Sequence, residues 1–172
     1  MSTLTKVSSN GNHKFTLTVV RNSSDVAANT SNITATFKIS PQTTNAYGWN
    51  YTSGNPVTYT IKLDGKSYTG TILKYTKNST ATIRTITVDV PHNVDGSKSI
   101  TYGFDVTSLS GNILPGTAST AAKETLTRIN RASTFTANGT WYIGHTNKYM
   151  TVTAYDNSFY HKVTYSMGSA SG

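Results

Sequence analysis

One pair of titratable side chains stands close enough in the sequence to suggest acid and base chemistry. His92 and Asp95 lie three positions apart in the stretch PHNVDGSKSI, and a positioned imidazole with a carboxylate can serve as a general base. The sequence indicates no nucleophile for such a pair. Pro91 cannot donate a hydrogen bond to a β-ladder and ends the preceding strand, while Asp95 and Gly96 favour a turn. We therefore predict a structural turn here and no active site.

The other carboxylates do not form a recognisable catalytic pair in the sequence either. A glycosidase needs two carboxyl groups across a cleft at a defined separation. Turns account for Asp64 and Asp95, and Asp89 and Asp105 fall on strand faces opposite the apolar residues. The seven carboxylates of the chain are Asp25, Asp64, Asp89, Asp95, Asp105, Glu124 and Asp156. We predict that the protein is not an enzyme.

The histidines do not show the spacing of a metal site. The four histidines are His13, His92, His145 and His161. They lack the short intervals that bring two imidazoles to one metal ion. His161 falls in phase with Phe159 and Val163, which predicts a core or interface position. A structural Ca²⁺ on loop carboxylates stays open as an option, since it requires several oxygen ligands together. We expect no cofactor.

The aromatic residues give the strongest indication of a contact site. In NAYGWNYTSGNP, an extended chain would place Tyr47, Trp49 and Tyr51 on one face, beside the amide of Asn50. A flat apolar ring flanked by amides suits a neutral sugar, and it also suits a protein interface. The competing interpretation is that Trp49 fills the core of the fold, as a single tryptophan often does.

A second aromatic group stands near the end of the chain. Trp141 and Tyr142 occur in TWYIGHTNKY, where they predict either the core of a second domain or a contact surface.

Composition restricts the classes of partner. Charged residues make up 13% of the chain, and 15 basic against 7 acidic residues give a net charge of +8. The basic residues are scattered, whereas a surface that follows nucleic acid phosphates needs them clustered, so we expect no nucleic acid partner. No cysteine is present for a disulfide, and no stretch has the length of a membrane span or the apolar centre of a signal peptide. We expect synthesis in the cytoplasm and no membrane partner.

Alternation of apolar and polar residues predicts many short strands. It runs through HKFTLTVVRN, ITATFKIS, VTYTIKL, TIRTITVDV and SITYGFDV, and no segment has sustained helical spacing. Asp64-Gly65 between two such runs predicts a tight hairpin, and Ile83, out of phase with Ile86, predicts a bulge near Arg84. Half-buried strands need a second sheet to cover their apolar face. The fold prediction is an all-β antiparallel sandwich, immunoglobulin-like or jelly-roll-like.

A change in composition divides the chain. The sandwich is predicted over residues 1–128, a linker over 129–134 and the start of a second β domain over 135–172. About forty residues with two strand signals cannot bury a core of their own. We therefore expect the chain to be the N-terminal part of a longer protein.

Several stretches resemble one family of viral proteins. These are NHKFTLTVVRNSSDVAANTSNITATFKIS, YTIKLDGKSYTGTI, PHNVDGSKSITYGFDV, ETLTRINRASTF and FYHKVTYSMGSASG. They resemble the minor structural proteins of siphoviruses that infect Gram-positive bacteria, a family of tail-tip or host-adhesion proteins. The most specific pieces are HNVDGSKSI and LTRINRAS, and the resemblance covers nearly the whole chain.

The resemblance implies a component of the virion, located in the phage tail at its tip or baseplate. It implies β domains in series that attach to other tail proteins and contact host cell wall polysaccharide, with a homotrimer as one option that tail symmetry leaves open. Whether this N-terminal region anchors the protein or recognises the host stays open, and an assembly role is favoured because tail adhesins commonly anchor at the N-terminus. The alternative is a carbohydrate-binding accessory module of a phage cell-wall hydrolase. No family residue roles transfer to positions of this chain, so the aromatic residues above remain the predicted contact site.

Overall fold

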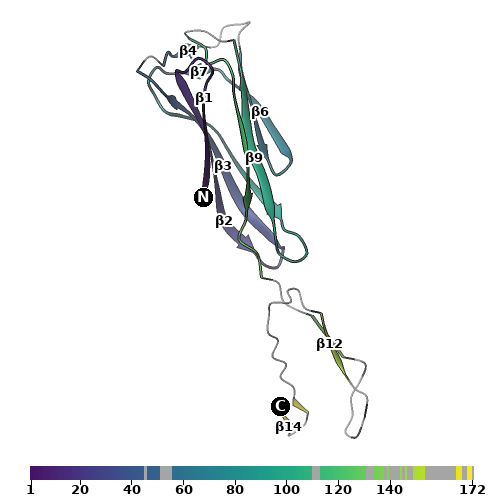
Figure 1. The fold of residues 1–172 in the computed structure, drawn as a ribbon. Helices are drawn as coiled ribbons and strands as arrows, with labels where there is room; N and C mark the ends of the chain where they lie inside the picture. The colour runs from purple at the N-terminus through teal and green to yellow at the C-terminus, as the bar shows by residue number, and fades with distance from the viewer. Residues whose placement is uncertain are drawn as a thin grey trace.

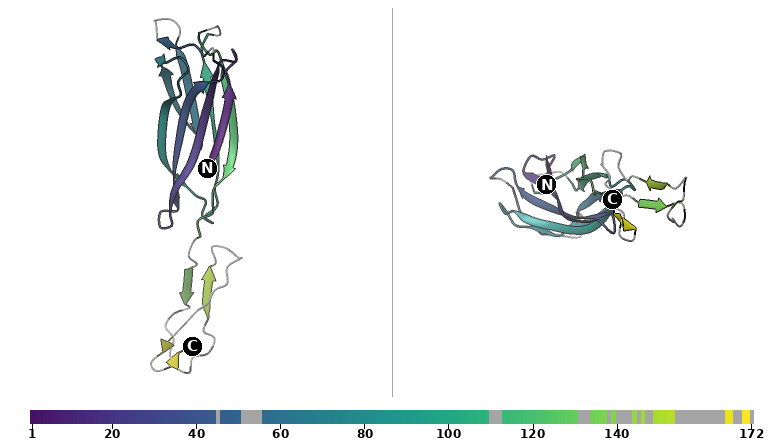
Figure 2. Two further views of the ribbon diagram at one scale, coloured as in Figure 1. Left: turned by 90° about the vertical axis from the view of Figure 1, so that its left-hand side faces the viewer. Right: turned by 90° about the horizontal axis from the view of Figure 1, so that it is seen from below.

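The structure, a computed structural model, confirms an all-β antiparallel fold. It describes residues 1–44, 46–50, 56–109, 113–130, 134–137, 139, 144, 146, 149–153, 166–167 and 170–171. Within these ranges the regular elements are all strands, and most belong to two four-stranded antiparallel sheets. The sheets lie face to face (Figures 1 and 2), and their buried apolar side chains form one shared core.

The first sheet has the strand order β1-β2-β3-β8. These strands are β1 (Ser2–Val7), β2 (His13–Asp25), β3 (Thr30–Pro41) and β8 (Ala81–Pro91).

The second sheet has the order β10-β9-β5-β6. Its strands are β5 (Val57–Leu63), β6 (Lys66–Ile72), β9 (Ser99–Thr107) and β10 (Ala118–Thr125).

Three small two-stranded sheets complete the described structure. β4 (Trp49–Asn50) pairs with β7 (Lys74–Tyr75) at one end of the sandwich. β11 (Thr134–Ala137) pairs with β12 (Met150–Thr153), and β13 (Ser166–Met167) pairs with β14 (Ala170–Ser171). The division at residues 128 and 134 stays a prediction.

The core lies between the sheets and follows the alternation in the sequence. In β2, Phe15 and Leu17 are fully buried, while Thr16 and Thr18, which alternate with them, are half-buried on the outer face. The Phe37 ring lies 5.9 Å from the Phe15 ring and 4.9 Å from the Phe104 ring, centroid to centroid. Because Phe104 belongs to the second sheet, these rings join the two layers.

Two local predictions are confirmed in detail. The β5–β6 hairpin turns at Asp64 and Gly65, both with positive φ (47° and 78°), as this dipeptide favours. In β8, Arg84 pairs with Phe37 and Thr82 with Lys38, so Ile83 between them is the extra residue of a bulge.

The loops between the strands lie at the two ends of the sandwich. We call one end the tip and define it as the described residues within 8–12, 42–50, 73–80 and 108–117. β4 and β7 lie there (Figure 1). At the opposite end, the chain leaves β10 and continues toward residue 130, beside the loop that contains His92. The tip and the point where the chain leaves β10 therefore lie at opposite ends of the sandwich.

Candidate functional site

His92 is held inside its turn by both ring nitrogens. The side chain is 8% exposed, with Nδ1 2.7 Å from the Gly96 carbonyl oxygen and Nε2 2.8 Å from Ser31 Oγ. A carbonyl can only accept, so Nδ1 carries the proton and, in the neutral ring, Nε2 accepts from the Ser31 hydroxyl. Neither nitrogen is free to take a substrate proton. The structure confirms the prediction of a structural turn.

Asp95 belongs to a separate set of contacts in the same loop. Its Oδ1 accepts hydrogen bonds from Ser97 N at 3.0 Å and from Ser97 Oγ at 2.7 Å. These bonds, and the charge of Arg128 with Nη2 3.5 Å from Asp95 Oδ2, hold the pKa of the Asp95 carboxyl below its usual range. His92 and Asp95 therefore do not work as a pair.

The His92 loop fastens the chain where it leaves the sandwich. Leu126 N donates to Lys98 O and Ile129 N donates to Gly96 O, each at 2.9 Å. Arg128 Nε donates to Asp95 O, also at 2.9 Å. We call residues 92–98 together with 126–129 the exit clamp. It joins the two stretches of sequence, HNVDGSKSI and LTRINRAS, that carry the family resemblance most specifically.

At the tip, the structure separates the residues predicted as one aromatic face. Trp49 is only 7% exposed and belongs to the core, and its Nε1 donates to Ile72 O at 3.4 Å. Tyr47, two residues earlier, is 43% exposed. The core interpretation of Trp49 is correct, and its buried ring cannot stack on a sugar. Asn50 is exposed beside it.

A buried histidine supports this part of the tip. His13 is fully buried, and its Nε2 lies 3.1 Å from the carbonyl oxygen of Tyr47. The imidazole meets the rings of Trp49 and Tyr75 edge-on, at centroid distances of 5.3 Å and 5.1 Å. Burial lowers the pKa of His13, and the hydrogen bond to Tyr47 opposes this effect only in part. The neutral ring with Nε2 protonated therefore fixes the backbone at Tyr47.

His13 is a functional residue that the search for metal-ligand spacing missed, although the sequence carries a signal for its burial. The alternation that places Phe15 and Leu17 in the core continues back to His13, which marks it as an inward residue. A buried polar ring needs a partner. That partner, the carbonyl of Tyr47, lies too far along the chain for a local pattern to show.

Gly48 allows the tip segment to lie close to β7. A Cβ atom at this position would stand 2.6 Å from Tyr75 O and 2.7 Å from Lys77 N, which no side chain tolerates without movement of the backbone. Gly48 thus permits the close packing that exposes Tyr47 on one side and buries Trp49 on the other.

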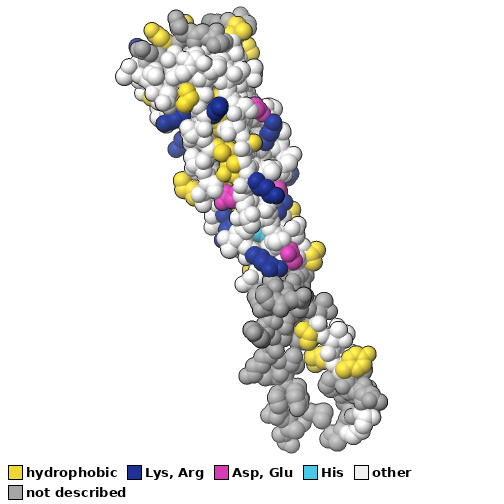
Figure 3. Space-filling view, in the orientation of Figure 1, with side chains coloured by type: hydrophobic (Ala, Val, Ile, Leu, Met, Phe, Trp, Pro, Cys, Tyr) yellow, Lys and Arg dark blue, Asp and Glu magenta, His cyan; other side chains and the backbone are white. Residues whose placement is uncertain are grey.

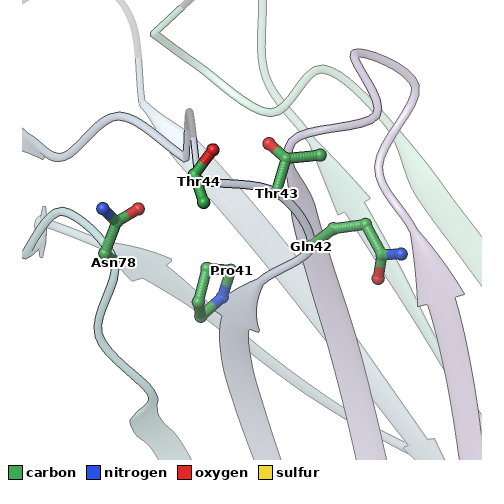
Figure 4. Close-up of a pocket in the computed structure, with 5 residues that line it drawn as sticks. All are labelled: Pro41, Gln42, Thr43, Thr44 and Asn78. Carbon is green, nitrogen blue, oxygen red and sulfur yellow. The ribbon is translucent and has the colours of Figure 1, made fainter.

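An open hollow with a volume of about 510 Å³ lies at the tip. Its lining residues are Pro41, Gln42, Thr43, Thr44 and Asn78 (Figure 4). Asn78 N donates to Ala46 O at 3.4 Å, which brings the turn after β7 against the segment that carries Tyr47. Lys77 Nζ lies 5.5 Å from the centroid of the Tyr47 ring. The hollow and the contact between Lys77 and Tyr47 therefore lie in neighbouring segments of the tip.

Several predicted residues fall outside the described part of the chain. Tyr51, Trp141 and Tyr142 lie there, so their contact roles remain predictions. His145 and His161 also lie outside it. Within the described residues, no three His, Cys, Asp or Glu side chains come together as metal ligands. The same residues contain no helix with the length and hydropathy of a membrane span.

Comparison with known proteins gives one match. The family described as "Siphovirus protein of unknown function (DUF859)" matches residues 4–172. Neither the curated proteins nor the solved structures contain a match to the chain.

Proposed function

Because the chain belongs to this siphovirus family over nearly its whole length, we propose that it is a noncatalytic structural protein of the virion. It attaches to other tail proteins at the tail tip or baseplate and contributes to adhesion to the host cell surface. The tip of the sandwich makes the host contact, and the exit clamp connects the sandwich to the rest of the tail protein.

The observation that carries this proposal is that the two opposite ends of the sandwich have different sets of contacts. At one end, the His92 loop binds the segment that follows β10, and the Ile129 side chain there is only 3% exposed. At the other end, Lys77 contacts the exposed ring of Tyr47, and the buried His13 ring binds the Tyr47 carbonyl and packs on Trp49. An adhesion module in a series of domains needs this division, because one end must be connected and the other must be free.

A noncatalytic role is consistent with how the titratable side chains are used. Both nitrogens of His92 serve the turn, and Asp95 serves the exit clamp. The Lys62 ammonium and Ser119 hydroxyl bind Asp105 and lower the pKa of its carboxyl. A carboxyl group with a lowered pKa is a poor general acid at neutral pH.

The proposal is tested with purified full-length protein and purified cell walls of candidate hosts. We expect the protein to sediment with the walls of a susceptible host and to release no soluble fragments from them. A Tyr47→Ala variant, which loses the exposed ring, should bind more weakly, whereas Tyr68→Ala, on β6 and away from the tip, should bind like the wild type. Wall lysis by the protein would favour the hydrolase module instead, and absence of binding would contradict the adhesion role.

A further inference from the structure

Carboxylates are unevenly distributed along the long axis of the sandwich, whereas basic side chains occur along its whole length, including Arg21, Lys66, Lys98, Lys123 and Arg128 toward the exit end. The lysines in its tip half are Lys6, Lys14, Lys38, Lys74 and Lys77. The carboxylates toward the exit end are Asp25, Asp64, Asp89, Asp95 and Glu124. On the face shown in Figure 3, the acidic side chains likewise lie below the tip.

Asp105 is the one described carboxylate in the tip half, and it is neutralised. Lys62 Nζ lies 2.8 Å from Asp105 Oδ2, and the Ser119 hydroxyl donates to the same carboxylate. The tip stretches 42–50, 73–80 and 108–117 contain no Asp or Glu in the sequence. The tip therefore carries an unopposed positive charge.

The hollow adds an uncharged surface beside this charge. Its lining offers hydroxyl and amide groups from Thr44, Gln42 and Asn78, which donate to and accept from the hydroxyls of a polyol. Lys77 is adjacent in the chain to Asn78, which lines the hollow, and its ammonium group lies over the Tyr47 ring. Lys74, three residues earlier on β7, is exposed nearby.

We propose that the tip binds a phosphodiester-linked polyol or sugar polymer of the host cell wall. Lys74 and Lys77 contact successive phosphates, and Tyr47 with the hollow accommodates the uncharged unit between them. This inference rests on the adhesion role proposed above and specifies its ligand.

Two features favour such a polymer over a neutral glycan or nucleic acid. A neutral glycan offers no negative charge to the ammonium groups of Lys74 and Lys77, and the tip stretches contain no carboxylate to pair with them. A duplex nucleic acid requires a dense row of basic side chains to follow its closely spaced phosphates. Two separate lysines beside a polar hollow suit a chain whose charges are spaced by uncharged units.

The size of the electrostatic contribution follows from Coulomb attraction in water. A lysine about 4 Å from a phosphate contributes about a five-fold gain in affinity when the contact is exposed to solvent. Removing both lysines should therefore lower affinity by about 25-fold. Raising the ionic strength from 0.1 to 1 M shortens the Debye length from about 10 Å to about 3 Å, so it should also weaken binding by the wild-type protein.

The test uses the full-length protein and host cell walls before and after treatment with aqueous hydrofluoric acid, which cleaves phosphodiester links. We expect binding to native walls, loss of binding to treated walls, and about 25-fold weaker binding by the Lys74→Gln/Lys77→Gln variant. Lys66→Gln, in the hairpin at the exit end, is the matched control and should bind like the wild type.

The outcomes separate this inference from the adhesion role. Equal binding to native and treated walls, unaffected by the two lysine substitutions, would overturn the phosphodiester ligand and leave adhesion standing. No binding to native walls would remove the adhesion role itself. Tighter binding to duplex DNA than to native walls, lost in the same double variant, would replace the wall polymer with nucleic acid and overturn the inference.

Discussion

Replacing His92 with alanine should destabilise the protein without removing any catalytic activity. The imidazole is buried and links the Gly96 carbonyl to the Ser31 hydroxyl, so it connects the turn to β3 of the first sheet. In the variant, Ser31 Oγ is left fully buried with only a weak contact to Ser24 Oγ at 3.4 Å.

The magnitude follows from two losses. A buried hydroxyl that loses its main partner costs about 1–3 kcal/mol, and removing a buried ring leaves a cavity that costs a similar amount. The three hydrogen bonds of the exit clamp, donated by Leu126, Arg128 and Ile129, do not involve the His92 side chain and therefore remain. We expect the free energy of unfolding to fall by about 3 kcal/mol, which is a large part of the 5–15 kcal/mol typical of a domain but leaves the protein folded.

The assay is urea unfolding of the full-length protein followed by circular dichroism. With a denaturant slope of about 2 kcal/mol per molar, the midpoint of the His92→Ala variant should lie about 1.5 M below that of the wild type. Val94→Ala is the matched control, because Val94 lies in the same loop and is 78% exposed, so its midpoint should not move. An unchanged midpoint for His92→Ala, or loss of a hydrolytic activity at unchanged stability, would refute the structural role.

Three further predictions concern the tip and the exit clamp. Gly48→Ala should lower the free energy of unfolding by about 1–3 kcal/mol, because the added methyl meets Tyr75 O and Lys77 N; an unchanged urea midpoint would contradict this packing. Ile129→Ala should cost about 2–4 kcal/mol and speed trypsin cleavage after Arg128, and equal cleavage of variant and wild type would show that the clamp does not protect the chain. Burial lowers the pKa of His13 in the folded protein below its ordinary value of 6.5, so the unfolded chain binds this proton more readily. The contribution of the neutral His13 to the free energy of unfolding is therefore fully present above pH 6.5, and it is lost as the pH falls toward the lowered pKa of the folded state. His13→Gln should flatten that part of the stability profile, and an identical slope in the variant would contradict the assignment.

The sequence predicted the features that depend on local patterns. Strict alternation located the inward faces of β2 and β3, because one face of each strand packs on the other sheet. Asp64 and Gly65 predicted their hairpin because both tolerate positive φ. The break in phase at Ile83 predicted the bulge. In each case the physical cause lies within a few residues of the signal.

The features that escaped prediction depend on contacts between distant segments. Trp49 was grouped with Tyr47 on the assumption of an extended chain, but the rings of His13 and Tyr75, from β2 and β7, enclose it in the core. The exit clamp joins Gly96 to Ile129, and no local pattern shows that pairing. The hollow at the tip likewise forms only when the turn at Asn78 meets the end of β3.

The central claim, that the protein is a structural part of the virion's adhesion apparatus, is tested most directly by locating it on purified phage. Antibodies raised against the full-length protein, with gold labels seen by electron microscopy, should mark the far end of the tail, and the protein should be present in the proteins of purified virions. Absence from purified virions, with the protein found only free in lysates, would contradict the account.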